Sequence, residues 1–324
     1  MKVLFAGGNF PSSKTLLARI ALDLKQSNIT TMFAGYDKHI PASTPYHWNL
    51  QSLRDLFRKS KGYPLSNTPP EWTLYKEFIE NGGFDFIITD FDRYTMDIAL
   101  SAGIPMLICS NRTMTLAQNA VKTGVIPKKI CTKFYQFLRD FLFLKEGCEK
   151  SLFYSHFSDV YTAPPSEHYC YIRPYCPVPK DFIPSNKLVW VLPNLIPYTK
   201  LVAKYPGSIV YTEDRLCIKD VEIVDLYNPR YFLDLAESRF VISDGDMITL
   251  SDAYYCGKFS YVIDPFMNLK TIDPFRFVAT NMSVKYGLAQ HVLDYNKFNF
   301  NDVVAPEIEV KKREDVQTLI EHFS

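Results

Sequence analysis

The chain has 324 residues, of which 47% are hydrophobic and 22% charged, and its net charge is +1. This composition predicts packed globular structure and excludes a disordered chain, and the length suggests two domains. No apolar run approaches the ~18 residues of a membrane span, and the apolar start is too short for a signal peptide. The seven cysteines are scattered without a CxxC pair. We therefore expect a reduced cytoplasmic protein without a zinc site.

Charge is unevenly distributed along the chain. Residues 1–150 contain 19 Lys or Arg and 13 Asp or Glu, whereas the remainder contains 17 and 22. A basic half is typical of a protein that meets an anionic partner through that half. Lysines scattered over a solvated surface would give the same count.

Strand and helix patterns alternate along the N-terminal half, which predicts βαβ units and a parallel sheet. The expected strands span 2–6, 30–34, 84–89 and 106–109, and the expected helices span 14–26 and 95–102. Residues 40–75, rich in Pro, Ser, Tyr and charged side chains, are predicted to leave the sheet. Residues 126–147 have the pattern of a basic amphipathic helix.

A proline-rich stretch at 163–186 is typical of a linker. A second α/β set follows it, with strands expected at 187–191, 208–212, 221–225, 240–242 and 260–263 and helices at 195–204, 229–237, 249–256 and 272–286. We predict a first domain at 1–165, a linker at 166–186, a second domain at 187–311 and a C-terminal helix at 312–324.

Residues 240–266 are the most informative for function. Phe240 to Ile242 is an apolar run of strand length, and Ser243 to Asp246 has turn chemistry. A short helix follows, and Gly257 suits the left-handed position that ends it. A helix N-terminus at the carboxyl end of a parallel strand is where α/β proteins hold phosphates, and Asp252 in that helix is placed to face a ribose diol.

This segment resembles the donor-nucleotide motif of GT-B glycosyltransferases, especially relatives of the peptidoglycan N-acetylglucosaminyltransferase and the UDP-glycosyltransferases. Those enzymes carry a stretch close to S-G-x-x-T-x-x-E-A-x-x-x-G-x-P. The matching positions here are Ser243, Gly245, Thr249, Asp252, Ala253, Gly257 and Pro265. Asp252 replaces the usual Glu, so its carboxylate has less reach.

Other segments extend the resemblance. Residues 84–91 with Ala99 and 103–105 resemble a pattern in the family's N-terminal half, and residues 271–274 with Asn281 and 287–288 resemble the stretch after the nucleotide motif. The family's first Gly-rich loop usually contains a His that is missing here. The resemblance implies an α/β GT-B fold, in which two Rossmann-like doubly wound domains face each other across a cleft, with the acceptor on the first domain and the donor on the second.

The resemblance also implies roles for individual residues in inverting transfer from a nucleotide sugar, for which we expect a UDP donor. The donor nucleotide would contact Ser243, Gly245, Thr249, Ser251 and Asp252, the donor sugar Asp273, and the phosphate or acceptor loop would be Gly8, Ser12, Ser13 and Lys14. From the sequence pattern itself, Asp92 is the favoured general base, followed by Asp90, because both follow a buried strand and should lie at its carboxyl end facing the cleft; Asp90 has the alternative role of capping its loop. No cofactor is expected beyond the nucleotide sugar; a divalent metal is compatible with the sequence but not indicated.

The acceptor is left open by the sequence. The basic residues of 54–61 and 126–147 favour an anionic acceptor, either a lipid-linked molecule or polysaccharide at a membrane surface, or a hydroxymethylated pyrimidine in phage DNA. Residues 11–15 resemble a P-S-S-E-T stretch of a phage DNA β-glucosyltransferase, which would place the protein in the host cytoplasm. Alternatively, helix 126–147 packs its apolar face into the core. A non-catalytic nucleotide- or nucleic-acid-binding protein of the same fold is the rival function.

Overall fold

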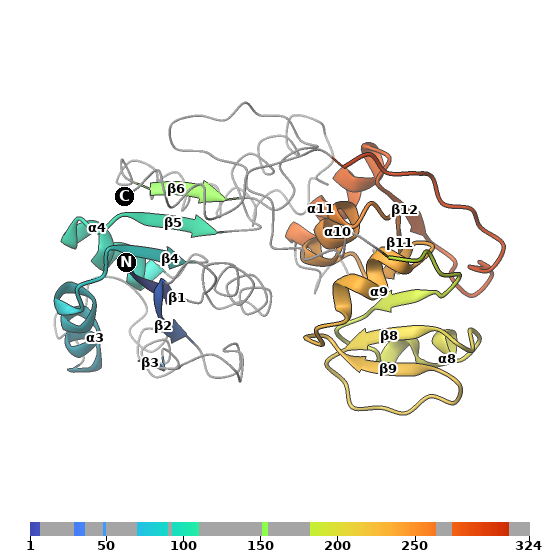
Figure 1. Ribbon diagram of the computed structural model, residues 1–324, viewed down its shortest axis with the longest axis horizontal. Helices are drawn as coiled ribbons and strands as arrows, with labels where there is room; N and C mark the ends of the chain where they lie inside the picture. Colours follow the sequence, from blue (N-terminus) through green and yellow to red (C-terminus); the bar gives the residue numbers. More distant parts are fainter. Residues whose placement is uncertain are drawn as a thin grey trace.

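The computed structural model describes residues 1–6, 29–35, 48–49, 70–89, 93–109, 151–154, 182–263 and 274–310. Within these ranges the chain forms two six-stranded parallel sheets, which lie at opposite ends of the molecule (Figure 1). Described helices connect several of the successive strands, as is usual for parallel pairing, whereas β8 and β9 are joined by a loop.

The first sheet has the strand order β3-β2-β1-β4-β5-β6. Its strands are β1 (Lys2–Ala6), β2 (Thr30–Gly35), β3 (Trp48–Asn49), β4 (Phe86–Thr89), β5 (Met106–Cys109) and β6 (Ser151–Tyr154), and its described helices are α3 (Pro70–Asn81) and α4 (Arg93–Ala102). All four residues of β4 are buried, as expected for a central strand covered on both faces.

The second sheet has the order β12-β11-β10-β7-β8-β9. Its strands are β7 (Val189–Val191), β8 (Ile209–Thr212), β9 (Glu222–Asp225), β10 (Val241–Ser243), β11 (Ser260–Ile263) and β12 (Ala289–Val292). The helices between them are the 3₁₀ turn η2 (Ile196–Tyr198), α8 (Thr199–Val202), α9 (Tyr231–Glu237), α10 (Met247–Tyr255) and α11 (Pro274–Lys285).

Side chains alternate between the two faces of the second sheet and build a core on each. Trp190, Val210 and Ile242 join one cluster with α8 and the chain around Phe300. Val189 and Val241 point the other way and pack under α9 and α10. Helices on both faces make this half doubly wound.

The strand order reverses direction at the centre of each sheet. In the first sheet the reversal falls between β1 and β4, and in the second between β7 and β10. Both sheets therefore have the 3-2-1-4-5-6 order of the Rossmann fold, whose ligands bind beyond the carboxyl ends of the strands at the reversal. In Figure 1 the arrows of β5 and β6 point toward the second sheet, and those of β8 and β9 point back toward the first.

The described residues confirm most of the expected strands and correct several details. Residues 40–75 do not simply leave the sheet, because Trp48–Asn49 pairs with β2 and α3 begins at Pro70. Two edge strands of four residues each, β6 and β12, were not expected from the sequence. The expected helices at 14–26, 126–147 and 312–324, and residues 166–181 of the expected linker, lie outside the described residues.

Candidate functional site

The turn between β10 and α10 lies at the reversal of the second sheet. Ser243, the last residue of β10, pairs with Val191 of β7. Helix α10 begins two residues earlier than its apolar pattern suggested, because Asp246 caps it: its carboxylate accepts hydrogen bonds from the N–H groups of Ile248 at 3.0 Å and Thr249 at 3.3 Å. This cap satisfies two of the N–H groups that a helix leaves free at its start.

Gly245 gives the turn its shape. Its φ of +85° lies in the left-handed region that only glycine adopts at little cost. Its N–H donates to the Ser243 hydroxyl at 3.2 Å, and its carbonyl accepts from the Thr280 hydroxyl of α11 at 3.3 Å. Both peptide groups of this glycine are therefore held by neighbouring side chains.

The carboxylate of Asp252 is buried inside the second half. Its exposed fraction is 0%, and it accepts a hydrogen bond from the Tyr231 hydroxyl at 3.0 Å. Tyr231 is the first residue of α9, so this bond joins α9 to α10. The carboxylate predicted to face the ribose thus lies behind the surface, bound to a protein hydroxyl.

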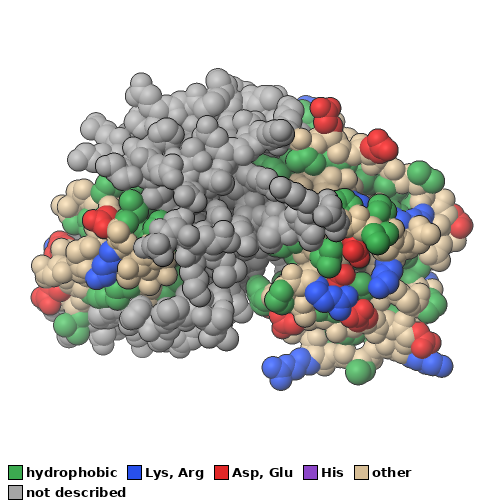
Figure 2. Space-filling model, viewed as in Figure 1, with side chains coloured by type: hydrophobic (Ala, Val, Ile, Leu, Met, Phe, Trp, Pro, Cys, Tyr) green, Lys and Arg blue, Asp and Glu red, His purple; other side chains and the backbone are tan. Residues whose placement is uncertain are grey.

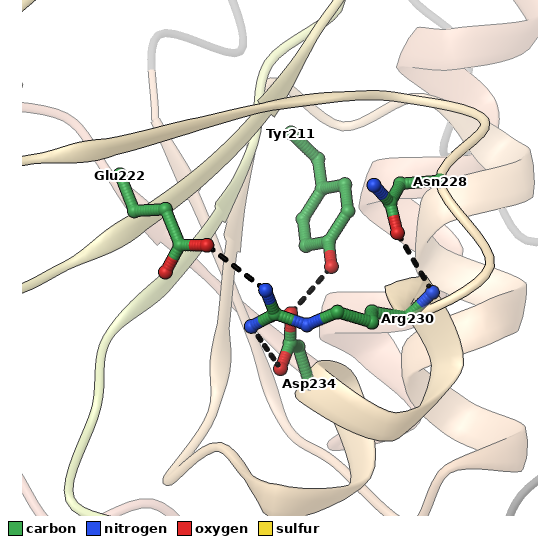
Figure 3. Close-up of polar contacts among 5 residues, drawn as sticks. All are labelled: Tyr211, Glu222, Asn228, Arg230 and Asp234. Atoms are coloured by element: carbon green, nitrogen blue, oxygen red, sulfur yellow. Dashed lines mark hydrogen bonds and ion pairs between the residues drawn. The ribbon is translucent and has the colours of Figure 1, made fainter.

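A second buried carboxylate anchors α9 to the sheet (Figure 3). Asp234 accepts from the Tyr211 hydroxyl of β8 at 2.5 Å and pairs with Arg230 at 3.3 Å. Arg230 also pairs with Glu222 of β9 at 3.0 Å. Burial, followed by the hydrogen bond to Asp234, raises the pKa of Tyr211 far above its usual range. These contacts hold the beginning of α9, and hence Tyr231, in place.

The loop after β7 faces the same reversal point. There the Asp214 carboxylate accepts from the N–H of Leu195 at 2.6 Å and of Ile196 at 3.2 Å. In both loops beside the reversal, N–H groups that would suit a phosphate are therefore bonded to a carboxylate of the protein itself.

Five of the predicted donor residues are brought together around this turn. Ser243, Thr249, Ser251 and Asp252 are buried polar side chains, and Gly245 is the buried residue at the centre of the turn. Of these side chains, that of Ser243 accepts a hydrogen bond from the turn itself, and those of Thr249, Ser251 and Asp252 are buried on α10. The other predicted site residues lie outside the described part of the chain: Gly8, Ser12, Ser13, Lys14, Asp90, Asp92 and Asp273.

Four residues with clear roles here were not predicted. An Asp directly before an apolar helix is a recognisable cap signal, so Asp246 was open to prediction. Asp214, Tyr231 and Thr280 contact the site from 19, 21 and 35 residues away in sequence, and no local pattern marks such contacts. Among the described residues, no group of three His, Cys, Asp or Glu is arranged to hold a metal ion. No described helix is long and apolar enough to cross a membrane.

The chain resembles known proteins in its structure. No protein-family model and no curated protein sequence matches the chain. Among solved structures, the spinosyn forosaminyltransferase SpnP superimposes with a TM-score of 0.59 at 13% identity, covering 93% of this chain and 88% of its own. The glycosyltransferase SsfS6 of Streptomyces sp. SF2575, complexed with thymidine diphosphate, gives 0.53 at 15% identity, covering 90% and 87%. The spinosyn rhamnosyltransferase SpnG complexed with thymidine diphosphate gives 0.53 at 10%, covering 90% and 86%.

These matches span both sheets and nearly the full length of the solved chains. They agree with the doubly wound sheets and the Rossmann strand order of both halves. The protein therefore has the GT-B fold, an α/β architecture of two Rossmann-like domains that it shares with these glycosyltransferases.

Proposed function

We propose that this protein transfers a glycosyl group from a nucleoside-diphosphate sugar to a hydroxyl acceptor with inversion. The observation that carries the proposal is the β10–α10 turn at the reversal of a Rossmann-ordered sheet. Ligands of such sheets bind beyond the carboxyl ends of the strands at this point. The likeness to glycosyltransferases solved with thymidine diphosphate supports the same donor class here.

In the proposed reaction, a carboxylate takes the proton of the acceptor hydroxyl while that oxygen attacks the anomeric carbon. The bond between the sugar and the diphosphate breaks, and the nucleoside diphosphate leaves with the electron pair. We propose Asp92 as the base, because it follows β4 in the sequence. Strand β4 lies beside the reversal of the first sheet, and ligands of a Rossmann sheet bind beyond the carboxyl ends of the strands there. The proposal assigns Asp273 to the donor sugar and requires no metal cofactor.

The second half offers little positive charge to a diphosphate in its two loops beside the reversal. The N–H groups of those loops are bonded to Asp214 and Asp246. The visible face of the described second half carries Lys and Arg side chains interspersed with Asp and Glu (Figure 2). The excess of Lys and Arg among residues 1–150 makes the first half the source of cations, with Lys14 as the proposed contact.

The same excess of positive charge supports an anionic acceptor. Hydroxymethylated duplex DNA and a lipid-linked acceptor in anionic vesicles are the two substrates to compare, over a series of salt concentrations. Transfer to either acceptor that weakens as the salt concentration rises supports an anionic acceptor. Transfer only to neutral small-molecule hydroxyls would contradict it.

The direct test is mass spectrometry of products after incubation with TDP- and UDP-sugars and these acceptors. A mass increase of one glycosyl unit, with release of nucleoside diphosphate, is the expected result. Asp92→Asn should abolish transfer and leave donor affinity unchanged, whereas Asp90→Asn, the control, should retain more activity. Full turnover in Asp92→Asn would remove that residue as the base.

The second candidate is a non-catalytic protein of this fold that binds a nucleotide. The β10–α10 turn at the reversal supports this candidate too, because nucleotide binding at that point of a Rossmann sheet needs no catalytic base. Calorimetric binding of TDP or UDP without any product from the full set of acceptors would support this candidate over the enzyme.

A further inference from the structure

The β10–α10 turn is supported from α11 as well as from its own residues. The Thr280 hydroxyl donates to the Gly245 carbonyl at 3.3 Å, and the Thr280 side chain is only 2% exposed. Buried carbonyls depend on such partners because water does not replace a lost donor in a packed interior.

Thr280 and Gly245 are packed in direct contact. A Cβ built on Gly245 would come within 2.5 Å of the Thr280 hydroxyl oxygen and 2.9 Å of a methyl of Val262. The turn therefore cannot move closer to α11. The position of α11 in turn fixes the position of the turn relative to the sheet.

The Gly245 peptide links this contact to the start of α10. Its N–H is held by Ser243 and its carbonyl by Thr280, and the next residue, Asp246, is the cap of α10. Rotation of the Gly245–Asp246 peptide would move the cap and the N–H groups of Ile248 and Thr249 together.

We propose that Thr280 is a positioning residue for the donor: its hydroxyl fixes the orientation of the Gly245–Asp246 peptide and so the place at which the turn meets a nucleoside diphosphate. This assignment rests on the proposed function, because it takes the turn as the donor site. Thr280 itself contacts only protein atoms in this role.

The test compares Thr280→Val, which removes the hydroxyl at nearly constant volume, with Thr280→Ser, which retains it. Ser238→Ala is the matched control, because Ser238 is a buried hydroxyl bonded to the carbonyl of Leu235 at the opposite, amino-terminal end of β10. Calorimetric affinity for TDP and UDP and the melting temperature are measured for all four proteins.

We expect Thr280→Val to weaken nucleotide binding by about five- to tenfold, the effect of one neutral hydrogen bond. Thr280→Ser should bind within about twofold of the parent, and Ser238→Ala should lower the melting temperature without changing affinity. Equal affinities of Thr280→Val and the parent protein would overturn the proposal.

Amide exchange in the ligand-free protein separates this proposal from the proposed function. Thr280→Val should accelerate exchange at the amides of 245–249, and Thr280→Ser should not. Faster exchange in Thr280→Val, combined with no nucleotide binding by the parent protein, would support the stabilising role of the Thr280–Gly245 hydrogen bond. It would refute both the donor role of Thr280 and the proposed function. Unchanged exchange in Thr280→Val would refute the stabilising role of this hydrogen bond itself. If Thr280→Val does not fold, Thr280→Ala is measured in the same way.

Discussion

Removing the Tyr231 hydroxyl should lower stability measurably, because that hydroxyl donates to a carboxylate with no exposed surface. In Tyr231→Phe the ring remains, so its edge-to-face contacts with Tyr211 at 5.0 Å and Phe232 at 5.1 Å are kept. What is lost is the 3.0 Å hydrogen bond to Asp252, whose carboxylate is 0% exposed. A hydrogen bond to a charged group contributes about 1.5–3 kcal/mol.

Loss of the Tyr231–Asp252 hydrogen bond should lower the melting temperature of the second half by about 3–10 °C, given the size of that domain. Urea unfolding followed by circular dichroism should show a lower midpoint with an unchanged m-value. Tyr205→Phe is the control with neutral partners: its hydroxyl donates to the Phe298 carbonyl at 3.0 Å and accepts from the N–H of Phe300 at 3.4 Å. We expect the shorter bond to account for most of the cost of this control, about 0.5–1.5 kcal/mol.

A double-mutant cycle with Asp252→Asn isolates the pair. Tyr231→Phe should cost at least about 1 kcal/mol less in the Asp252→Asn background than in the parent protein. If Tyr231→Phe costs no more than Tyr205→Phe, or if the two changes are additive, the hydrogen bond does not contribute as argued.

Nucleotide binding by the same variants tests the predicted ribose contact of Asp252. A carboxylate that contacts the ribose should discriminate between UDP and its 2′,3′-dideoxy analogue, and Asp252→Asn should remove that discrimination. A carboxylate that acts only through Tyr231 should leave the ratio of the two affinities unchanged. Because the structure buries Asp252 against Tyr231, we expect the unchanged ratio.

Gly245→Ala should destabilise the protein by about 2–4 kcal/mol in urea unfolding, since a methyl group meets Thr280 at 2.5 Å; Gly207→Ala, with φ +78° but nothing within 4 Å, should cost only about 1 kcal/mol, and equal costs would contradict the steric argument. Asp246→Ala should cost about 1 kcal/mol of stability by loss of the helix cap, measured as the urea midpoint and compared with Asp246→Asn. The same variant should bind nucleoside diphosphate more tightly in calorimetry. Weaker binding would show that the carboxylate does not compete with the diphosphate for the N–H groups of α10. The pKa of Tyr211 is higher in the folded protein than the value of about 10 in the unfolded chain, so its contribution to stability is full below pH 10 and is lost as the pH rises above 10. The urea midpoint should therefore fall above pH 10 in the parent protein and fall less in Tyr211→Phe. Transfer should persist in EDTA, because the proposed mechanism uses no metal ion; loss of activity that Mg²⁺ restores would refute this.

Local sequence patterns predicted most of the second half. The apolar run at 240–242 became the buried strand β10, and the polar residues after it became the turn. Gly257 has the expected left-handed φ of +69°, and the amides of Gly257 and Lys258 bond back to the carbonyls of Tyr254 and Ala253. These features follow from the residues nearest in sequence, so a single chain suffices to predict them.

The environment of the site depended on contacts between distant residues. The sequence marked Asp252 and Gly245 as functional, but it held no sign that Tyr231 would bond to the first or Thr280 to the second across 35 residues. Strand order likewise arises from which apolar faces pack together, and it places Val241 of β10 beside Val189 of β7, 52 residues earlier in the chain. The sequence by itself thus determined the turn and its helix, through local conformational preference. Only the tertiary structure decided that the predicted donor side chains lie buried behind that turn, because burial depends on the elements that cover it.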